Sequence, residues 1–289
     1  MPTAPTIVIT GATSGIGELA AIELARRGAR LALTALSRQR AEVTRGRILA
    51  AAPGTEIQIF LADFARMADV RRARAAIAEF YDRIDVLINN AGVITFTPRV
   101  TVDGFAEMMA VNYLAPWLLT QALVPTLLRT PGSRIVTVAS EASRQHGTLR
   151  LPHDLTDTDP ATARVPAPMY GKTKLLDIMF TLELARRLTG TGVTANCLHP
   201  GFNATGLARE IRAATPFMAV LKRVHIGDPA RGAGLIVKLA TDPSFAGISG
   251  GYYGVRGTRR LTPVAPAGDP KLQAQLWTET EKLLRARTV

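Results

Sequence analysis

A short apolar strand, followed at once by a glycine-rich loop and a helix, opens the sequence and restricts its fold more than any other feature. Residues 6–10 form a β-rich apolar run, Gly11, Gly15 and Gly17 follow, and apolar residues with helical spacing continue to Gly28. These pieces in this order form a unit that binds a pyrophosphate, because glycines let the backbone approach the phosphates and the helix N-terminus supplies N–H donors. The spacing is G-x-x-x-G-x-G instead of G-x-G-x-x-G, so a tight turn without a ligand is the alternative interpretation.

Strands and helices alternate along the rest of the chain. Further strands are predicted at 30–35, 56–62, 85–88, 134–138, 194–198 and 251–253. Helices are predicted at 37–51, 68–81, 169–188, 230–239 and 271–285, and one or two more at 103–128, where Pro116 and Pro125 restrict their regularity. Several strands are apolar on both faces, which is typical of a parallel sheet covered by helices on both sides. We therefore expect an α/β protein with a doubly wound, Rossmann-like parallel sheet in three layers.

A single domain over residues 1–289 is expected, since 289 residues with 47% hydrophobic content suffice for one substantial core. Two stretches, at about 141–168 and 202–227, leave the strand–helix alternation. The residues suited to binding or chemistry follow the ends of predicted strands: Gly11–Gly17, Asp63, Asn89–Gly92, Ser140 and Pro200–Gly201. In open parallel sheets ligands bind at that edge, which indicates that these motifs belong to one site.

Tyr170 and Lys174 are four residues apart in a predicted helix, so both side chains lie on one face. A free phenol titrates near pH ~10 and is a poor acid or base at neutral pH. A nearby ammonium favours the phenolate, and we expect Lys174 to bring the pKa of Tyr170 towards the working range of a general acid/base. Taken alone, the pair is weak evidence, because such pairs arise by chance on helices and a solvated tyrosine with a surface lysine is then the favoured interpretation.

The charge of the chain invites a nucleic-acid interpretation, which its distribution does not support. The net charge is +12, from 35 basic and 23 acidic residues, but only six of the basic residues are Lys and the rest are scattered Arg. No aromatic residues alternate with the small basic clusters. We therefore expect a small-molecule substrate and no nucleic-acid partner, and note that an anionic cofactor would benefit from the same positive field.

The cysteine, histidine and hydropathy patterns limit which disulfides, metal sites and membrane segments the chain can contain. Cys197 is the single cysteine, so no intramolecular disulfide can form, and its apolar surroundings predict a buried hydrophobe. The four histidines show no metal-ligand spacing, and we expect no metal. Residues 1–5 show no signal-sequence pattern, and the most apolar segment, 110–128, contains Asn112 and Pro116 and is typical of a buried helix. A cytoplasmic protein without a membrane span is the expectation.

Six motifs together resemble the short-chain dehydrogenase/reductase family in its compact form. They are Thr10-Gly-Ala-Thr-Ser-Gly-Ile-Gly17, Asn89-Asn-Ala-Gly92, Val111-Asn112-Tyr113, Ser140, Tyr170-x-x-x-Lys174 and Pro200-Gly201-x-x-x-Thr205. Within the family the chain looks most like the retinol-dehydrogenase-like group, through Val111-Asn-Tyr-Leu-Ala-Pro-Trp-Leu-Leu-Thr120, Tyr170-Gly-Lys-Thr-Lys-Leu175, His199-Pro-Gly201 and Gly250-Gly-Tyr-Tyr253. Many members of that group have an N-terminal membrane anchor, and we expect none here.

The resemblance implies catalytic roles for four residues. Tyr170 would donate a proton to a carbonyl oxygen in reduction, or accept one from an alcohol in oxidation. Lys174 would lower the pKa of Tyr170 and bind the nicotinamide ribose, and Ser140 would hold the carbonyl oxygen, with Ser143 a less favoured candidate for that task. Asn112 would hold a water that links Lys174 to solvent. His199 is expected to pack or cap and not to catalyse.

The resemblance also implies a set of cofactor-binding residues. Asp63 would accept a hydrogen bond from the adenine amino group with Phe64 behind it, and Asn90, Ala91 and Gly92 would line the adenosine side. The complete set is Gly11, Thr13, Ser14, Gly15, Ile16, Gly17, Ser37, Arg38, Asp63, Phe64, Asn90, Ala91, Gly92, Tyr170, Lys174, Pro200, Gly201, Phe202 and Thr205. Phe202 and Thr205 would meet the carboxamide and the phosphates.

The end of the second strand bears on the choice of cofactor. An acidic residue there would bind a ribose 2′-hydroxyl, whereas a basic residue would accept a 2′-phosphate. Residues 34–40 contain no Asp or Glu, which favours NADP(H) over NAD(H), although Leu36 stands where the family usually has its arginine. Ser37 and Arg38, or Arg40, could still reach the phosphate.

The expected function is hydride transfer between NADP(H) and a carbonyl or alcohol group of an apolar substrate. The substrate class is suggested by a stripe of apolar residues in the second excursion: Leu207, Ile211, Phe217, Met218 and Leu221. Ordinary core packing explains that stripe equally well. Two alternatives stay open, namely non-redox elimination or cyclisation with the bound cofactor, and nucleotide sensing without turnover. Relatives commonly pair through the helices of Asn112 and Tyr170, so a homodimer is the default expectation.

Overall fold

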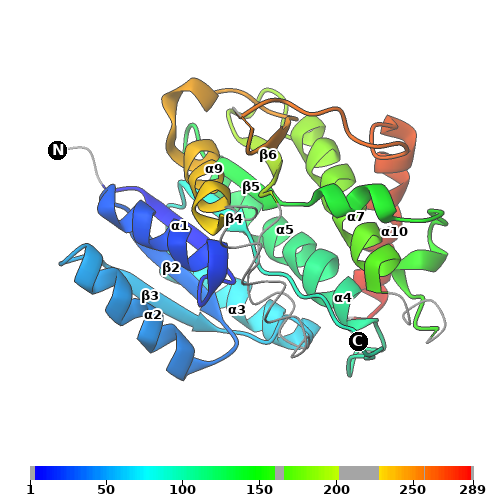
Figure 1. Cartoon of the computed structure of the whole chain (residues 1–289), viewed down its shortest axis with the longest axis horizontal. Coiled ribbons are helices and arrows are strands. Elements are labelled where there is room, and N and C mark those ends of the chain that lie inside the picture. Colours follow the sequence, from blue (N-terminus) through cyan, green and yellow to red (C-terminus); the bar gives the residue numbers. More distant parts are fainter. Residues whose placement is uncertain (1–3, 160–165, 202–227, 257, 288–289) are drawn as a thin grey trace.

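The chain forms one parallel sheet of seven strands covered by helices on both faces (Figure 1). The computed structural model describes residues 4–159, 166–201, 228–256 and 258–287. The strand order is β3-β2-β1-β4-β5-β6-β7, and every neighbouring pair is parallel. The strands are β1 (Thr6–Thr10), β2 (Arg30–Ala35), β3 (Ile57–Leu61), β4 (Val86–Asn89), β5 (Arg134–Val138), β6 (Thr194–His199) and β7 (Tyr252–Gly254). This confirms the predicted doubly wound α/β fold, with strand ends within one or two residues of the sequence prediction.

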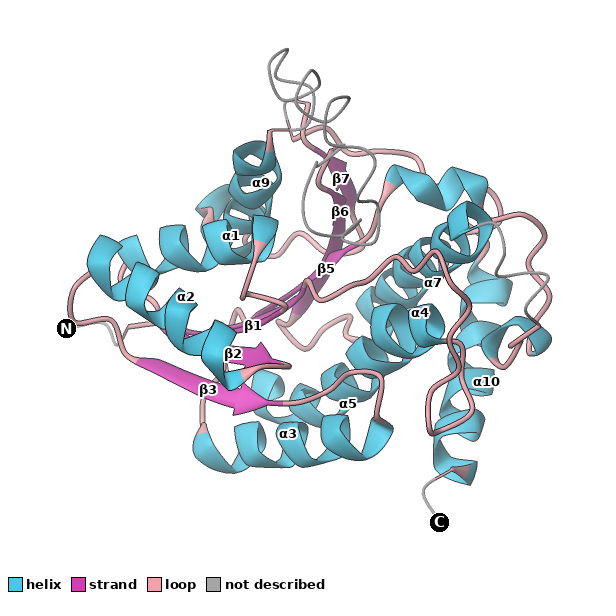
Figure 2. Ribbon diagram, turned by 60° about the horizontal axis from the view of Figure 1, so that its bottom comes forward, coloured by secondary structure: helices cyan, strands magenta, loops and turns pink. Residues whose placement is uncertain are grey.

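Helices form the two outer layers (Figure 2). The long helices are α1 (Gly15–Arg26), α2 (Arg38–Ala51), α3 (Met67–Phe80), α5 (Ala115–Leu128), α7 (Pro166–Arg187), α9 (Pro229–Thr241) and α10 (Pro270–Ala286). Helix α1 packs against α2 and α9 on one face, whereas α3 packs against α5 and α10 against α7 on the other. Short helical turns are α4 (Glu107–Met109), η1 (Ala110–Leu114), η2 (Glu141–Gln145), η3 (His153–Leu155) and η6 (Pro243–Phe245).

The strands divide their side chains between two cores. Ile7 and Ile9 of β1 belong to the cluster beneath α1 and α9, whereas Val8 between them belongs to the cluster on the opposite face. All three are fully buried. Because successive strand residues point to opposite faces, a central strand needs an unbroken apolar run to fill both cores. That requirement explains why the strands could be found in the sequence.

The segment expected to hold one or two irregular helices is a continuous helical run from Glu107 to Leu128 that contains a π-helical turn, η1. Pro116 lacks the N–H that would donate to the carbonyl of Asn112 in a regular helix, and the N–H of Ala115 reaches back five residues to Ala110 instead. The predicted effect of Pro116 is therefore confirmed, and it falls on the turn that carries Asn112.

Helix α10 packs against two long helices, α5 and α7, on one side of the sheet. Trp277 of α10 stacks on Phe180 of α7, with ring centroids 5.8 Å apart, and meets Trp117 of α5 edge-on at 5.7 Å. The hydroxyl of Tyr113 in η1 lies 2.8 Å from that of Thr280 in α10. No helix in the described ranges is long and apolar enough to span a bilayer.

Candidate active site

The strand order reverses between β1 and β4, and the glycine loop lies at the carboxyl end of that junction. Gly11 and Gly15 have φ of +67° and +60°, a backbone region that side-chain-bearing residues rarely adopt. A Cβ added at Gly17 would lie 2.6 Å from the carbonyl oxygen of Gly11, so the loop is too tightly wound for any larger residue there. This close-wound loop ends at the N-terminus of α1, which suits a bound pyrophosphate.

The glycine loop is fastened to the end of β4. The Thr10 hydroxyl oxygen accepts hydrogen bonds from the backbone N–H groups of Asn90 and Ala91, each at 2.9 Å. The Asn90 side-chain amide donates to the carbonyl oxygens of Thr10 at 2.8 Å and of Gly11 at 3.2 Å. Asn90 therefore braces the loop, and its expected contact with the adenosine stays a prediction.

A pocket of about 470 Å³ opens between this loop and α2. Its lining residues are Thr13, Ser14, Gly15, Glu18, Gln39, Arg40, Val43, Thr44 and Arg47. Arg47 forms a 2.8 Å ion pair with Glu18, whereas the Arg40 side chain has no ion-pair partner among the described residues. Arg38 lies outside the lining, is two-thirds exposed, and is 3.9 Å from Glu42. The structure thus brings Arg40 to the pocket and leaves Arg38 on the outer surface of α2.

Ser37 and Asp63 are both occupied with local backbone contacts. The Ser37 hydroxyl accepts from the backbone N–H of Arg40 at 3.4 Å and caps α2. The Asp63 carboxylate accepts from the N–H of Ala65 at 2.9 Å, and Phe64 beside it is buried. Both residues lie at the carboxyl edge of the sheet, as expected, and their contacts with a cofactor stay predictions.

Helix α7 and the end of β5 bring together the three residues expected to carry the chemistry. Ser140 follows β5, and its hydroxyl interacts with the phenol of Tyr170 and accepts from the N–H of Ala142 at 3.1 Å. The Lys174 ammonium lies 5.8 Å from the centroid of the Tyr170 ring. It donates to the Val138 carbonyl at 2.9 Å and to the Asp177 carboxylate at 2.8 Å. Serine, tyrosine and lysine thus form one connected group.

Asn112 lies on the other side of Lys174, inside the π-helical turn. Its amide oxygen accepts from the N–H of Val93 at 2.7 Å, and its amide nitrogen donates to the Val93 carbonyl at 2.9 Å and to the Thr173 hydroxyl at 3.1 Å. A Cβ added at Gly92 would lie 3.5 Å from the Asn112 amide oxygen and 3.7 Å from the Lys174 nitrogen. Asn112, Gly92 and Lys174 therefore adjoin one another. The proton relay through a water stays a prediction.

Close packing between α7 and the first excursion sets the position of Tyr170. A Cβ added at Gly171 would clash with the carbonyl of Ala142 in η2. The N–H of Glu141, at the start of η2, donates to the Nδ1 atom of His199 at 3.2 Å, which confirms the capping role predicted for that histidine. Ser143 is buried in the same turn. The Tyr252 hydroxyl also donates to the Glu141 carboxylate, at 3.3 Å.

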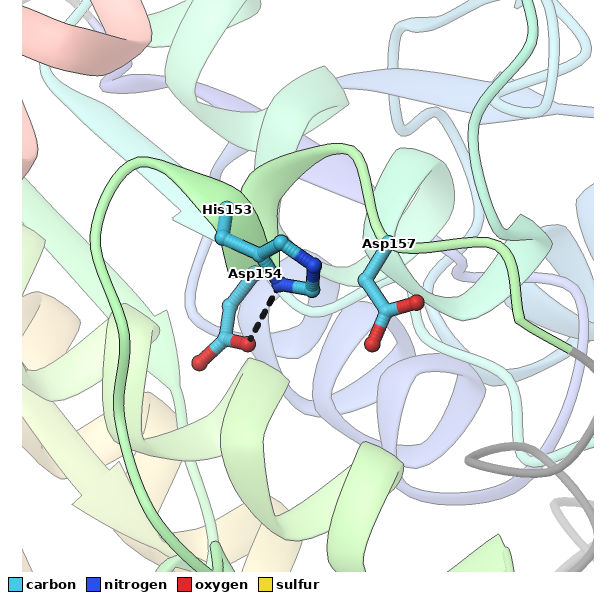
Figure 3. Close-up of side chains that lie close together, drawn as sticks. All are labelled: His153, Asp154 and Asp157. Atoms are coloured by element: carbon cyan, nitrogen blue, oxygen red, sulfur yellow. Dashed lines mark hydrogen bonds and ion pairs between the residues drawn. The ribbon is translucent and has the colours of Figure 1, made fainter.

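A second group of polar side chains, His153, Asp154 and Asp157, lies in and just after η3 (Figure 3). Their nearest polar atoms are within 4.8 Å of one another. The buried Asp154 carboxylate already has a cation, because the Lys172 ammonium lies 2.9 Å from it, and it accepts the Arg150 N–H at 2.7 Å. We therefore assign this group the task of anchoring the first excursion to α7.

With this geometry in hand, comparison with known proteins decides the family. Residues 5–152 match the family described as short chain dehydrogenase. The chain belongs to the short-chain dehydrogenase family. It is 36% identical to retinol dehydrogenase 14 of Mus musculus over 293 aligned residues, which cover 96% of this chain and 85% of that protein. Members of this family are NAD(P)-dependent oxidoreductases, and this dehydrogenase resembles the retinol-dehydrogenase group, as predicted.

Two solved structures with bound nicotinamide cofactors share the fold. The RhlG/NADP active-site complex of Pseudomonas aeruginosa superposes with a TM-score of 0.70 at 25% identity, covering 89% of this chain and 96% of that one. A variant of the actinorhodin polyketide ketoreductase with NADPH superposes with a TM-score of 0.68 at 26% identity, covering 88% and 97%. These likenesses support a nicotinamide cofactor for this chain.

The electrostatics of the dehydrogenase correct one expectation. Burial raises the pKa of Tyr170 and the Lys174 ammonium lowers it, but the net direction is upward. The expected lowering towards neutrality is wrong for this state, because removal of the phenolate from water outweighs an ammonium whose charge is shared with Asp177. At neutral pH Tyr170 is therefore a protonated phenol.

Several predicted cofactor residues are placed only in part. Pro200 and Gly201 follow β6 at the expected edge, and Gly201 has φ of +81°. Phe202, Thr205 and the apolar stripe from Leu207 to Leu221 lie outside the described residues. Cys197 is fully buried in β6, which confirms its predicted role as a small hydrophobe.

Sequence reasoning missed two residues of this site. Asp177 follows Lys174 by three positions, a spacing that places a carboxylate beside the ammonium on one helix face. Arg47 follows Arg40 by seven positions, so both lie on the face of α2 towards the glycine loop. In both cases the helical spacing was present, but nothing in the sequence marked which charged residues would be buried or turned to the loop.

Proposed function

We propose that this dehydrogenase transfers hydride between NADP(H) and a carbonyl or alcohol group of an apolar substrate, with Tyr170 as the acid/base. One observation carries the proposal: the Ser140–Tyr170 hydroxyl pair, with Lys174 beside it, shares the carboxyl edge of the sheet with the glycine loop. Because the Ser140 and Tyr170 hydroxyls adjoin each other, both can contact a single carbonyl oxygen and one of them can supply its proton.

In reduction, the two hydroxyls polarise the carbonyl group of the substrate. Ser140 donates a hydrogen bond to the carbonyl oxygen, and Tyr170 transfers its proton to that oxygen as negative charge develops. A nicotinamide cofactor, when bound, would supply the hydride that this reduction requires. Lys174, held by Val138 and Asp177, stabilises the phenolate that remains on Tyr170 until a proton returns from solvent.

The pocket beside the glycine loop supports NADP(H) over NAD(H). Arg40 and Arg47 both line it, and Arg47 is neutralised by Glu18 while the Arg40 charge has no carboxylate partner among the described residues. A guanidinium without a partner is suited to a phosphate, which it can meet through two parallel hydrogen bonds. The relatives solved with NADP or NADPH agree with this preference.

The substrate class rests on the names of the similar proteins. One is named for retinol, which is large and mostly apolar, and another for a polyketide, which is large and carries ketone groups. We infer a bulky apolar ketone, aldehyde or alcohol. The apolar stripe of the second excursion agrees with such a substrate.

Turnover with a panel of apolar ketones and aldehydes, followed by the loss of NADPH fluorescence, tests the proposal. Wild-type protein should consume NADPH with at least one of them. Tyr170→Phe should lower kcat by about 100- to 10,000-fold, the range that general acid catalysis contributes, and leave the Kd for NADPH within a few-fold. Product formation without NADPH consumption would instead support the non-redox alternative, and a fully active Tyr170→Phe would refute the role of Tyr170.

A further inference from the structure

Asp177 is an ionisable residue of helix α7 that, in the proposed chemistry, does nothing beyond contacting Lys174. Its side chain is 2% exposed, and one carboxylate oxygen lies 2.8 Å from the Lys174 nitrogen. The other oxygen, Oδ1, is buried without a hydrogen-bond partner among the described residues. A buried carboxylate with half of its hydrogen-bonding capacity unmet is destabilising in itself, so its presence beside the catalytic lysine calls for a functional reason.

The contacts of Lys174 show what the carboxylate does. The ammonium is bound on one side by the Val138 carbonyl at the end of β5 and on the other by Asp177. These two contacts direct the lysine towards the strand end that also leads to Ser140. The Asp177 carboxylate also partly neutralises the Lys174 ammonium, whose positive charge favours ionisation of Tyr170.

We propose that Asp177 is a positioning residue that holds Lys174 at the end of β5 and offsets its charge, so that Tyr170 is kept as a protonated phenol, ready to act as the acid in carbonyl reduction. The inference rests on the proposed function and adds a preferred direction to it. An uncompensated ammonium would favour the phenolate, which is the base needed for alcohol oxidation.

The remaining groups that face Asp177 do not compete for this role. Tyr113 in η1 and Cys197 in β6 both sense its charge, and burial raises the pKa of each. They are therefore neutral across the physiological range. Lys174 is then the only charged side chain among the described groups coupled to Asp177. Burial raises the pKa of Asp177 to about 6, so its carboxyl is ionised above that pH.

The magnitude follows from the helix. Tyr170 and Asp177 are seven residues apart on α7, which places them about 10 Å apart along the axis at ~1.5 Å per residue. Removing one charge at that distance, with an effective dielectric constant of about 20, should lower the pKa of Tyr170 by about one unit. Asp177→Asn removes the charge and keeps an oxygen that can accept from Lys174.

Spectrophotometric titration of tyrosine ionisation tests the inference without turnover. The difference between a protein and its Tyr170→Phe counterpart isolates Tyr170 from the other four tyrosines. Asp177→Asn should move this ionisation down by about one pH unit. In carbonyl reduction the alkaline loss of kcat should shift by the same amount, because activity requires the protonated phenol.

Glu183→Gln is the matched control. Glu183 is also a buried acid of α7, but it is paired with Arg187 at 2.7 Å and lies 13 residues beyond Tyr170. Its charge lies about 20 Å from Tyr170 along the axis at ~1.5 Å per residue and is balanced by Arg187, so any shift should be less than half of that in Asp177→Asn. Asp177→Ser, a second neutral variant, should behave like Asp177→Asn.

An unchanged Tyr170 ionisation in a folded Asp177 variant would overturn the inference, as would a shift of equal size in Glu183→Gln. Failure of both neutral variants to fold would assign Asp177 to stability and also overturn it. If wild-type protein reduces no carbonyl compound while the Tyr170 shift is found, the proposed function fails and the role of Asp177 in setting the charge of the site stands.

Discussion

The cofactor preference can be tested by one pair of neighbouring arginines. Arg40 lines the pocket beside the glycine loop, and Arg38 lies two residues earlier on the outer surface of α2 with 66% of its side chain exposed. The same substitution at both positions removes one positive charge from the same helix. Only the position relative to the pocket differs, so long-range charge effects should cancel in the comparison.

The expected size follows from the contact that is lost. A hydrogen bond to a charged partner contributes about 1.5–3 kcal/mol. Arg40→Ala should therefore raise the Kd for NADPH by roughly 10- to 150-fold, because each ~1.4 kcal/mol is a factor of ten. The Kd for NADH should change by less than about three-fold, since NADH lacks the 2′-phosphate. Arg38→Ala should leave both values within about two-fold, given its 3.9 Å separation from Glu42 in solvent.

Fluorescence titration of purified protein with NADPH and NADH measures all four constants, and repetition at higher salt should shrink the Arg40 effect. Two results would refute the reasoning. One is an Arg38→Ala loss as large as that of Arg40→Ala, which would mean that α2 turns differently when the cofactor binds. The other is equal weakening of NADPH and NADH in Arg40→Ala, which would remove the 2′-phosphate from the explanation.

Two further changes test the loop and the packing of the last helix. Gly17→Ala should abolish measurable binding of either cofactor, because the added methyl group would clash with the Asn90 side chain and widen the loop; nucleotide titration together with circular dichroism would separate this from unfolding. Trp277→Ala should destabilise the protein by about 3–5 kcal/mol in urea unfolding, since the ring is 7% exposed and packs on Phe180, whereas Val102→Ala at a 75% exposed site should change stability by less than about 0.5 kcal/mol.

The fold could be predicted because its signals are local. Strands such as β1 and β4 are apolar on both faces, and the glycines mark the turn at the sheet edge. The grouping of Ser140, Tyr170 and Lys174 could be predicted because Tyr170 and Lys174 come from one helix and Ser140 follows a strand end. These features need only the periods of strand and helix and the rule that parallel strands end at one edge.

What could not be predicted depends on helix phase and burial. Arg38 and Arg40 are about 200° apart around α2, so which one faces the loop depends on where the helix begins, and Ser37 sets that point. The direction in which the pKa of Tyr170 shifts depends on how completely folding removes the phenol from water. The spacing of residues in the sequence does not reveal this. Asp177 was missed because its burial beside Lys174 is likewise not visible in the sequence. The homodimer and the cytoplasmic location stay predictions.

The position of α10 over α7 has a consequence for how the enzyme is made. The chain leaves the ribosome from its N-terminus, and α10 occupies residues 270–286 of 289. Helix α7, which carries Tyr170 and Lys174, therefore keeps an uncovered apolar side around Phe180 until α10 has emerged. A nascent chain stalled before Trp277 should thus be a natural client for chaperones that bind exposed apolar helices. Catalytic competence should arrive only once α10 has docked, well after the cofactor loop has formed.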